Sequence, residues 1–242
     1  MHPAGGLCSV FNELARYLKN DVSIIGLQAR GLEGNQRPFE NFSEMIDCYE
    51  AAIEAHGEYR VYNIIGYSAG ATIAHELACR LEKKGRTVGL VGLLDGMIPG
   101  SSDEEQKQSR LEILQELVAE YIEGANDITN YDQLLGLAVS LMIQKGFAPE
   151  GTPAEFANRM VEEMVLSGTR MRGYFLGEGR FDSVYFAADA EPPSQETTDM
   201  RQQWLNYCRS VTYVSIEATH NKLLESEPSQ TIAAYIQRYL RQ

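Results

Sequence analysis

The chain has 242 residues, enough for one large domain, and 44% of them are apolar, which is ordinary for a soluble globular protein. Its formal net charge of −13 argues against binding to nucleic acid or to an anionic membrane surface. No apolar stretch approaches the roughly 18 residues of a membrane-spanning helix, and no secretory leader pattern is present, so we expect a cytoplasmic protein. The cysteines are dispersed, without a CxxC pair, and we expect reduced thiols (Cys8, Cys48, Cys79, Cys208).

Apolar patterns in the first hundred residues predict alternating strands and helices. Short apolar runs indicate buried strands and helical spacing indicates helices (strands at residues 21–27, 61–65 and 87–94; helices at 43–56 and 69–84). Ser43 is the expected N-cap of the first helix, and Gly85 ends the second. Strand, helix and strand in this order imply a right-handed parallel crossover and therefore an α/β sheet.

The pattern changes between residues 101 and 180, where helical periodicity replaces strand character. An acidic start at 103–105 precedes the amphipathic runs, and strand character then returns before a last helix (helical runs at 111–122, 134–143 and 156–171; strands at 183–187 and 211–216; helix at 229–240). We therefore expect one α/β domain over residues 1–242 with a helical insertion at about 101–180. The alternative is that the insertion forms a small separate domain.

A serine between two glycines follows the strand at 61–65. The sequence GYSAG, from Gly66 to Gly70, matches the GxSxG nucleophile elbow, in which the serine occupies a sharp turn between strand and helix. The two glycines relieve the crowding that side chains would create at such a turn. The helix that follows points its N-terminal N–H groups toward the site, which favours developing negative charge near Ser68.

A serine nucleophile needs a base, and His220 is the expected one among four histidines. It lies in a loop after the strand at 211–216, and loops at the carboxyl ends of parallel strands meet at one edge of the sheet. The other histidines have positions that suit packing, capping or solvent exposure better (His2, His56, His75).

Two aspartates are candidates for the acid that orients this base. Asp95 ends the strand at 87–94 and is expected beside Ser68, whereas Asp189 follows the strand at 183–187. Both satisfy the chain order of nucleophile, acid and histidine. The residues alone leave both candidates open.

Four segments carry a resemblance to a known family. They are HPAGG at residues 2–6, GLQARGLEG at 26–34, GEYRVYNIIGYSAGATIAHELA at 57–78 and LLDG at 93–96. In this order and spacing the chain resembles the thioesterase domains of nonribosomal peptide and polyketide synthases, a branch of the α/β-hydrolases. The resemblance implies a mostly parallel sheet flanked by helices, with residues 101–180 as a variable helical lid.

The resemblance also implies roles for individual residues. Ser68 would be the acylated nucleophile and His220 its base. The LLDG context favours Asp95 as the acid, as in synthase-embedded domains, while Asp189 would match stand-alone editing relatives. The backbone N–H groups of Ala4 and Ala69 would form the oxyanion hole.

Two features depart from the family pattern. Ala71 stands where many relatives have another glycine. Relatives also carry a strand ahead of the HPAGG loop, which here begins at residue 2. This start favours a chain excised from a larger synthase, and the alternative of a stand-alone chain stays open.

From the resemblance we expect release of an acyl or peptidyl chain from the phosphopantetheine thioester of a partner carrier protein. Release would proceed through an acyl-serine by hydrolysis or cyclisation, without a metal or a resident cofactor. Adaptable apolar side chains of the lid would line the acyl pocket (Met142, Phe147, Phe156, Met160, Met164, Met171, Tyr174, Phe175). The alternatives are a stand-alone editing (type II) thioesterase, a generic carboxylester hydrolase and a non-catalytic binding module.

Overall fold

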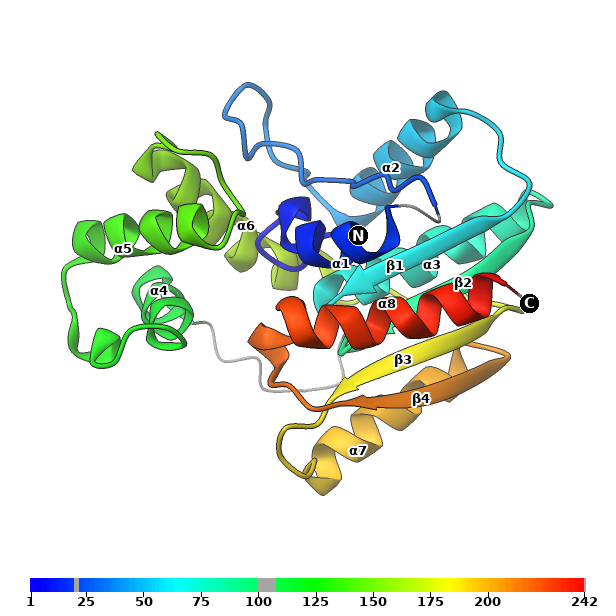
Figure 1. Cartoon of the computed structure of the whole chain (residues 1–242). Helices are drawn as coiled ribbons and strands as arrows, with labels where there is room; N and C mark the ends of the chain where they lie inside the picture. Colours follow the sequence, from blue (N-terminus) through cyan, green and yellow to red (C-terminus); the bar gives the residue numbers. More distant parts are fainter. Residues whose placement is uncertain (20–21, 100–107, 242) are drawn as a thin grey trace.

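A computed structural model of the chain describes residues 1–19, 22–99 and 108–241. Within these residues, parallel strands form one sheet in the order β1–β2–β3–β4 (Figure 1). The strands are β1 (Tyr62–Tyr67), β2 (Val88–Leu94), β3 (Asp182–Ala188) and β4 (Ser210–Ile216). The predictions at 61–65, 87–94, 183–187 and 211–216 are therefore confirmed, with ends that differ by one or two residues.

Helices cover both faces of this sheet. In Figure 1, α1 and α8 lie in front of it and α3 lies behind it. The helices are α1 (Asn12–Leu18), α2 (Phe42–His56), α3 (Ala69–Lys83), α4 (Arg110–Ala119), α5 (Tyr131–Gln144), α6 (Ala154–Met171), α7 (Gln195–Gln202) and α8 (Ser226–Leu240). Because both faces are covered, β2 is fully buried from Leu90 to Leu94. Among the described helices, none combines the length and the apolar character needed to cross a membrane.

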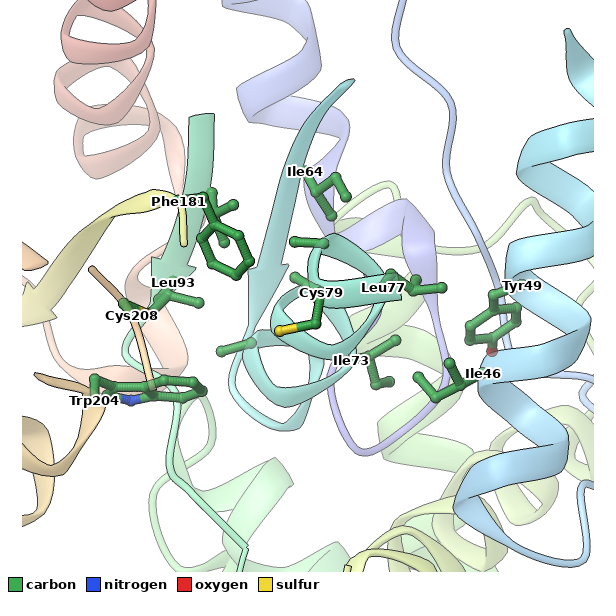
Figure 2. Packing of buried hydrophobic residues seen from close by; sticks show 14 of the residues in the cluster. Ile46, Tyr49, Ile64, Ile73, Leu77, Cys79, Leu93, Phe181, Trp204 and Cys208 are labelled. Carbon is green, nitrogen blue, oxygen red and sulfur yellow. The ribbon is translucent and has the colours of Figure 1, made fainter. Parts of the chain in front are cut away.

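The main core lies between α2, α3 and the rear face of the sheet. Figure 2 shows Ile73 and Leu77 of α3 facing Ile46 and Tyr49 of α2. On the other side of α3, the buried Trp204 packs in the same cluster. Burial of this many apolar side chains fixes α3, and therefore the residue immediately before it, relative to the strands.

The strand predicted at residues 21–27 is absent. Residue 21 lies outside the described residues, and residues 22–27 are irregular, with Ile24 and Ile25 exposed by 46% and 47%. A strand needs a neighbour to pair its backbone groups, and no described strand lies beside this segment. Along the outer edge of β1, the Tyr67 N–H instead donates to the Met1 carbonyl, at 3.3 Å.

Helix starts differ from the predictions at two places. The N-cap of α2 is Asn41 and not Ser43, because the Asn41 side chain accepts a hydrogen bond from the Glu44 N–H at 2.9 Å. The last helix begins at Ser226 rather than 229. Helices α1 and α7 were not predicted from the sequence.

Helices α4, α5 and α6 confirm the three helical runs predicted in the insertion, and the acidic start at 103–105 lies outside the described residues. Their buried side chains form a cluster that also includes Leu7, Ala29 and Leu32 from the N-terminal loops. Helix α6 is tied to those loops by Arg170, whose Nε donates to the Phe39 carbonyl at 2.7 Å. The insertion therefore packs against the N-terminal loops as well as on itself.

Candidate active site

Ser68 occupies a strained turn between β1 and α3. Its backbone has φ of 56° and ψ of −126°, in a region that residues other than glycine rarely adopt. A Cβ at Gly66 would lie 1.8 Å from the Gly70 carbonyl oxygen, and a Cβ at Gly70 would lie 2.4 Å from the His2 carbonyl oxygen. Both glycines are therefore required by close backbone approach, which was the reason given for them from the sequence.

The structure brings Ser68, Asp95 and His220 together at the carboxyl edge of the sheet. His220 Nε2 lies 3.1 Å from Ser68 Oγ, and His220 Nδ1 lies 2.8 Å from Asp95 Oδ2. Because a carboxylate only accepts, Nδ1 carries the proton and Nε2 is left to accept from the serine hydroxyl. This is the geometry of a serine that a histidine can deprotonate.

The other oxygen of Asp95 is held from the opposite side. Asp95 Oδ1 accepts from the Ala188 N–H at 3.2 Å and from Arg201 Nη2 at 3.1 Å. Burial alone would raise the pKa of Asp95, but the hydrogen bond and charge of His220, the Ala188 N–H and the Arg201 charge together hold that pKa below its ordinary value. Asp95 is therefore an ionised acceptor that faces the imidazole.

The rival carboxylate has a different partner. Asp189 Oδ1 accepts from Arg201 Nη1 at 2.6 Å, and its backbone N–H donates to the Ile216 carbonyl at 2.9 Å. Of the two candidates, Asp95 contacts His220, whereas Asp189 pairs with Arg201. Arg201, on α7, was not identified from the sequence, since a lone arginine in a polar helix gives no signal of its contacts.

The remaining histidines contact other groups. His2 is buried between the Tyr49 hydroxyl, 2.6 Å from Nε2, and the Pro3 carbonyl, 2.7 Å from Nδ1. Burial lowers the pKa of His2 from 6.5 to about 4, so it stays neutral near pH 7. His75 packs in the core beside the Gly177 carbonyl, and His56 is exposed.

The expected oxyanion-hole residues are Ala69, which directly follows the serine, and Ala4, which lines the same cavity. Ala69 is the first residue of α3, so its N–H has no intrahelical acceptor. Ala4 lies in the turn closed by the Gly6 N–H and the Pro3 carbonyl at 2.9 Å, and it lines the same cavity as Ser68.

Tyr67 contacts His220, and this contact was not predicted from the sequence. Its hydroxyl donates to the His220 carbonyl at 2.7 Å, and its ring lies 5.1 Å from the imidazole between centroids. It occupies the variable position before the elbow serine, where the motif sets no residue type, so only the tertiary structure shows this contact.

A cavity of about 220 Å³ opens from Ser68 and His220 toward the insertion. Four of the predicted lining residues do line it (Met142, Phe147, Met160, Met164). The other four do not: Met171 and Tyr174 pack with the main core, Phe156 packs within the insertion, and Phe175 is 92% exposed. Only one face of α6 reaches the cavity, and Met160 and Met164, four residues apart, share that face.

Charged side chains occupy one part of the cavity wall. Lys145, after α5, bonds Glu225 at 2.7 Å and lies 4.2 Å from the centroid of the Tyr121 ring. Burial and the charges of Glu225 and Glu120 raise the pKa of Tyr121 to about 12. These residues were not predicted from the sequence.

Part of the chain is similar in sequence to known synthetases. The chain is 42% identical over 99 residues to an inactive atromentin synthetase of Paxillus involutus, which covers 41% of this chain and 10% of that protein. It is 37% identical over 117 residues to the malpinin synthetase of Mortierella alpina, covering 46% of this chain and 2% of that protein. The chain therefore spans a tenth or less of the length of these relatives.

The fold is shared with solved structures. In a crystal structure of a holo four-domain nonribosomal peptide synthetase, the matched part covers 98% of this chain and 19% of that chain, with a TM-score of 0.77 and 19% identity. The predicted α/β-hydrolase fold is thereby confirmed. The model of the thioesterase domain family matches residues 1–239. The chain belongs to the thioesterase domain family.

Proposed function

We propose that Ser68, His220 and Asp95 form a catalytic triad that cleaves thioesters through an acyl-serine. The observation that carries the proposal is the continuous chain of hydrogen bonds from the Ser68 hydroxyl through the imidazole to the Asp95 carboxylate. Arrangement by role and geometry, rather than sequence position, is what identifies such a triad.

In the first step His220 Nε2 takes the hydroxyl proton while Ser68 Oγ attacks the thioester carbonyl carbon. The negative charge that develops on the carbonyl oxygen would be held by the N–H groups of Ala69 and Ala4, and one such donor typically contributes about 3–4 kcal/mol. When the tetrahedral intermediate collapses, the C–S bond breaks and the imidazolium returns its proton to the departing thiolate. Asp95 orients the ring and stabilises its positive charge throughout.

In the second step His220 deprotonates water or a nucleophile of the acyl chain itself. Attack on the acyl-serine then releases an acid or a ring, and the proton returns to Ser68 Oγ. The cavity beside the two residues, lined by Met142, Met160 and Met164, would hold the acyl chain during both steps.

We further propose that the substrate is an acyl or peptidyl chain on the phosphopantetheine of a carrier protein. The named relatives are synthetases, and one structural neighbour is a nonribosomal peptide synthetase. The position of Asp95 after β2 supports a domain of the synthase-embedded type over a stand-alone editing enzyme.

Intact-protein mass spectrometry with acyl-pantetheine thioesters tests the proposal. The wild-type chain and the control Ser140→Ala, an exposed serine on α5, should gain the acyl mass, and Ser68→Ala should not. An adduct retained in Ser68→Ala would refute the nucleophile assignment. A clear preference for a matched oxygen ester would favour a carboxylester hydrolase, and failure of a fluorophosphonate to label Ser68 would favour a non-catalytic module.

A further inference from the structure

We infer that Arg201 is a positioning residue for the triad, and that Asp189 sets how strongly Arg201 acts on Asp95. The inference rests on the proposed function, because it concerns the acid that orients His220. It also explains why the chain carries two aspartates at the edge of the sheet where one acid is sufficient.

Arg201 reaches the two carboxylates with one guanidinium fork. Its Nη2 donates to Asp95 Oδ1 and to the Ala188 carbonyl, each at 3.1 Å, and its Nη1 donates to Asp189 Oδ1 at 2.6 Å. A planar fork of this kind fixes the direction of each bond, which a lysine ammonium does not. The Asp95 carboxylate can therefore present only Oδ2 to His220.

The guanidinium is held in a buried position. The Arg201 side chain is 9% exposed, and the Tyr213 hydroxyl of β4 donates to the Arg201 backbone carbonyl at 2.8 Å. Within the described residues, Arg201 Nε is buried without a hydrogen-bond partner. Such an unpaired buried donor is unfavourable for stability. The cluster is therefore poorly explained as a device for stability alone.

Charge explains what the cluster does. Arg201 offsets part of the negative charge of Asp95, so Asp95 stabilises the imidazolium less than an isolated carboxylate would. Asp189 pairs with the same guanidinium and partly neutralises its charge, which limits how far Arg201 offsets the charge of Asp95. The variants compared below leave the other ionisable groups around Asp95 and His220 unchanged, so these groups do not account for a difference between variants. They are Tyr67 on β1, Glu120 and Tyr121 after α4, Tyr185 on β3, Lys145 after α5, and Lys222 and Glu225 after β4.

The two partners consequently predict opposite changes. Removing the Arg201 charge should let Asp95 hold the imidazolium more tightly, so His220 would stay protonated to higher pH. Removing the Asp189 charge should leave Arg201 to act on Asp95 alone, so His220 would lose its proton at lower pH. A purely structural role predicts a loss of stability without this reversal of sign.

The experiment is an NMR titration of the His220 ring Cε1–H resonance in the full chain. The chain has four histidines, so the resonance can be assigned with His220→Gln. Arg201→Met should move the titration midpoint up, and Asp189→Asn should move it down, each by about 0.5–1 pH unit. The matched control is Arg209→Met, which removes an exposed arginine paired with Asp182 at the other end of the sheet, and it should leave the midpoint unchanged.

The acid limb of the rate of Ser68 labelling by a fluorophosphonate should move with the midpoint. Arg201→Lys, which keeps the charge without the fork, should keep the midpoint near that of the wild type and slow labelling several-fold. If Arg201→Met does not fold, Arg201→Lys and Asp189→Asn decide the question.

Unchanged midpoints in Arg201→Met and Asp189→Asn, midpoint shifts of the same sign in these two variants, or an equal shift in Arg209→Met would overturn the inference. The titration needs no turnover, so its outcome is separate from that of the proposed function. Opposite shifts in a chain that never acylates Ser68 would support the electrostatic coupling and refute the thioesterase mechanism.

Discussion

Asp95→Asn is the substitution that tests the triad most directly, because the surroundings fix how the new amide would lie. Asp95 Oδ1 accepts from the Ala188 N–H and from Arg201 Nη2, two groups that can only donate. The asparagine carbonyl must take this place, which turns its NH₂ group toward His220 Nδ1. The imidazole then has to accept at Nδ1 and carry its proton on Nε2, where it cannot accept the proton of Ser68.

A wrong tautomer of this kind lowers kcat by about 10⁴ in a serine protease triad, which corresponds to about 5 kcal/mol of lost transition-state stabilisation. We expect a loss of that order for acyl-enzyme formation, measured by single-turnover kinetics with an acyl-pantetheine thioester. Asp189→Asn should lose less than about tenfold, and the control Asp182→Asn, a half-exposed aspartate at the other end of β3, should lose nothing. Circular dichroism and thermal unfolding would verify that all three variants fold. A loss below tenfold in Asp95→Asn would refute the reasoning, and a larger loss in Asp189→Asn than in Asp95→Asn would return the acid role to Asp189.

Three further predictions follow from other parts of the structure. Burial lowers the pKa of His2 to about 4, so the unfolded chain binds more protons than the folded chain between pH 6.5 and 4, and stability should fall as the pH falls through this window. His2→Gln should remove up to about 3 kcal/mol of that pH dependence in urea unfolding, and an unchanged dependence would exclude His2 as its source. A Cβ at Gly96 would lie 2.0 Å from the Ala71 Cβ, so Gly96→Ala should lower the free energy of unfolding by about 1–3 kcal/mol. A Cβ at Gly96 would also lie 2.8 Å from the Ser68 carbonyl oxygen, so Ala71→Gly in the same chain should restore only part of the loss, and strictly additive effects would contradict the contact between residues 71 and 96. Ala138 lines the cavity from α5. Ala138→Phe should therefore slow the release of long acyl chains by about tenfold or more. Acetyl-pantetheine serves as the internal control, and an equal loss for both substrates would show that the cavity does not hold the chain.

Much of the fold could be predicted because the sheet strands are buried on both faces. Such strands appear in the sequence as short apolar runs, and all four strands of the described sheet were predicted from them. The run at 21–27 looked the same but is irregular, since a local pattern does not show whether a neighbouring strand is present. Helix α1 is short, and the polar helix α7 gives no apolar stripe on which a sequence-based prediction could rest.

The positions of Ser68 and His220 at the site were predictable for local reasons. Ser68 needs glycines at fixed positions on either side, and His220 follows a strand whose carboxyl end faces the site. Ala71, which stands where many relatives have glycine, is accommodated by a contact that the sequence did not reveal. The Cβ of Ala71 occupies space that is free because residue 96 is glycine.

The amino-acid sequence by itself determined the elbow, the α/β class and the resemblance to the thioesterase domains, because each depends on residues close together in the chain. Only the tertiary structure shows which of Asp95 and Asp189 contacts His220. Both follow strands at the same edge, and they differ in which partner reaches them. His220 arrives from the loop after β4, and Arg201 arrives from α7. Side chains separated by more than a hundred residues are brought within 3 Å by packing of the sheet and helices, and no local pattern in the chain encodes that distance.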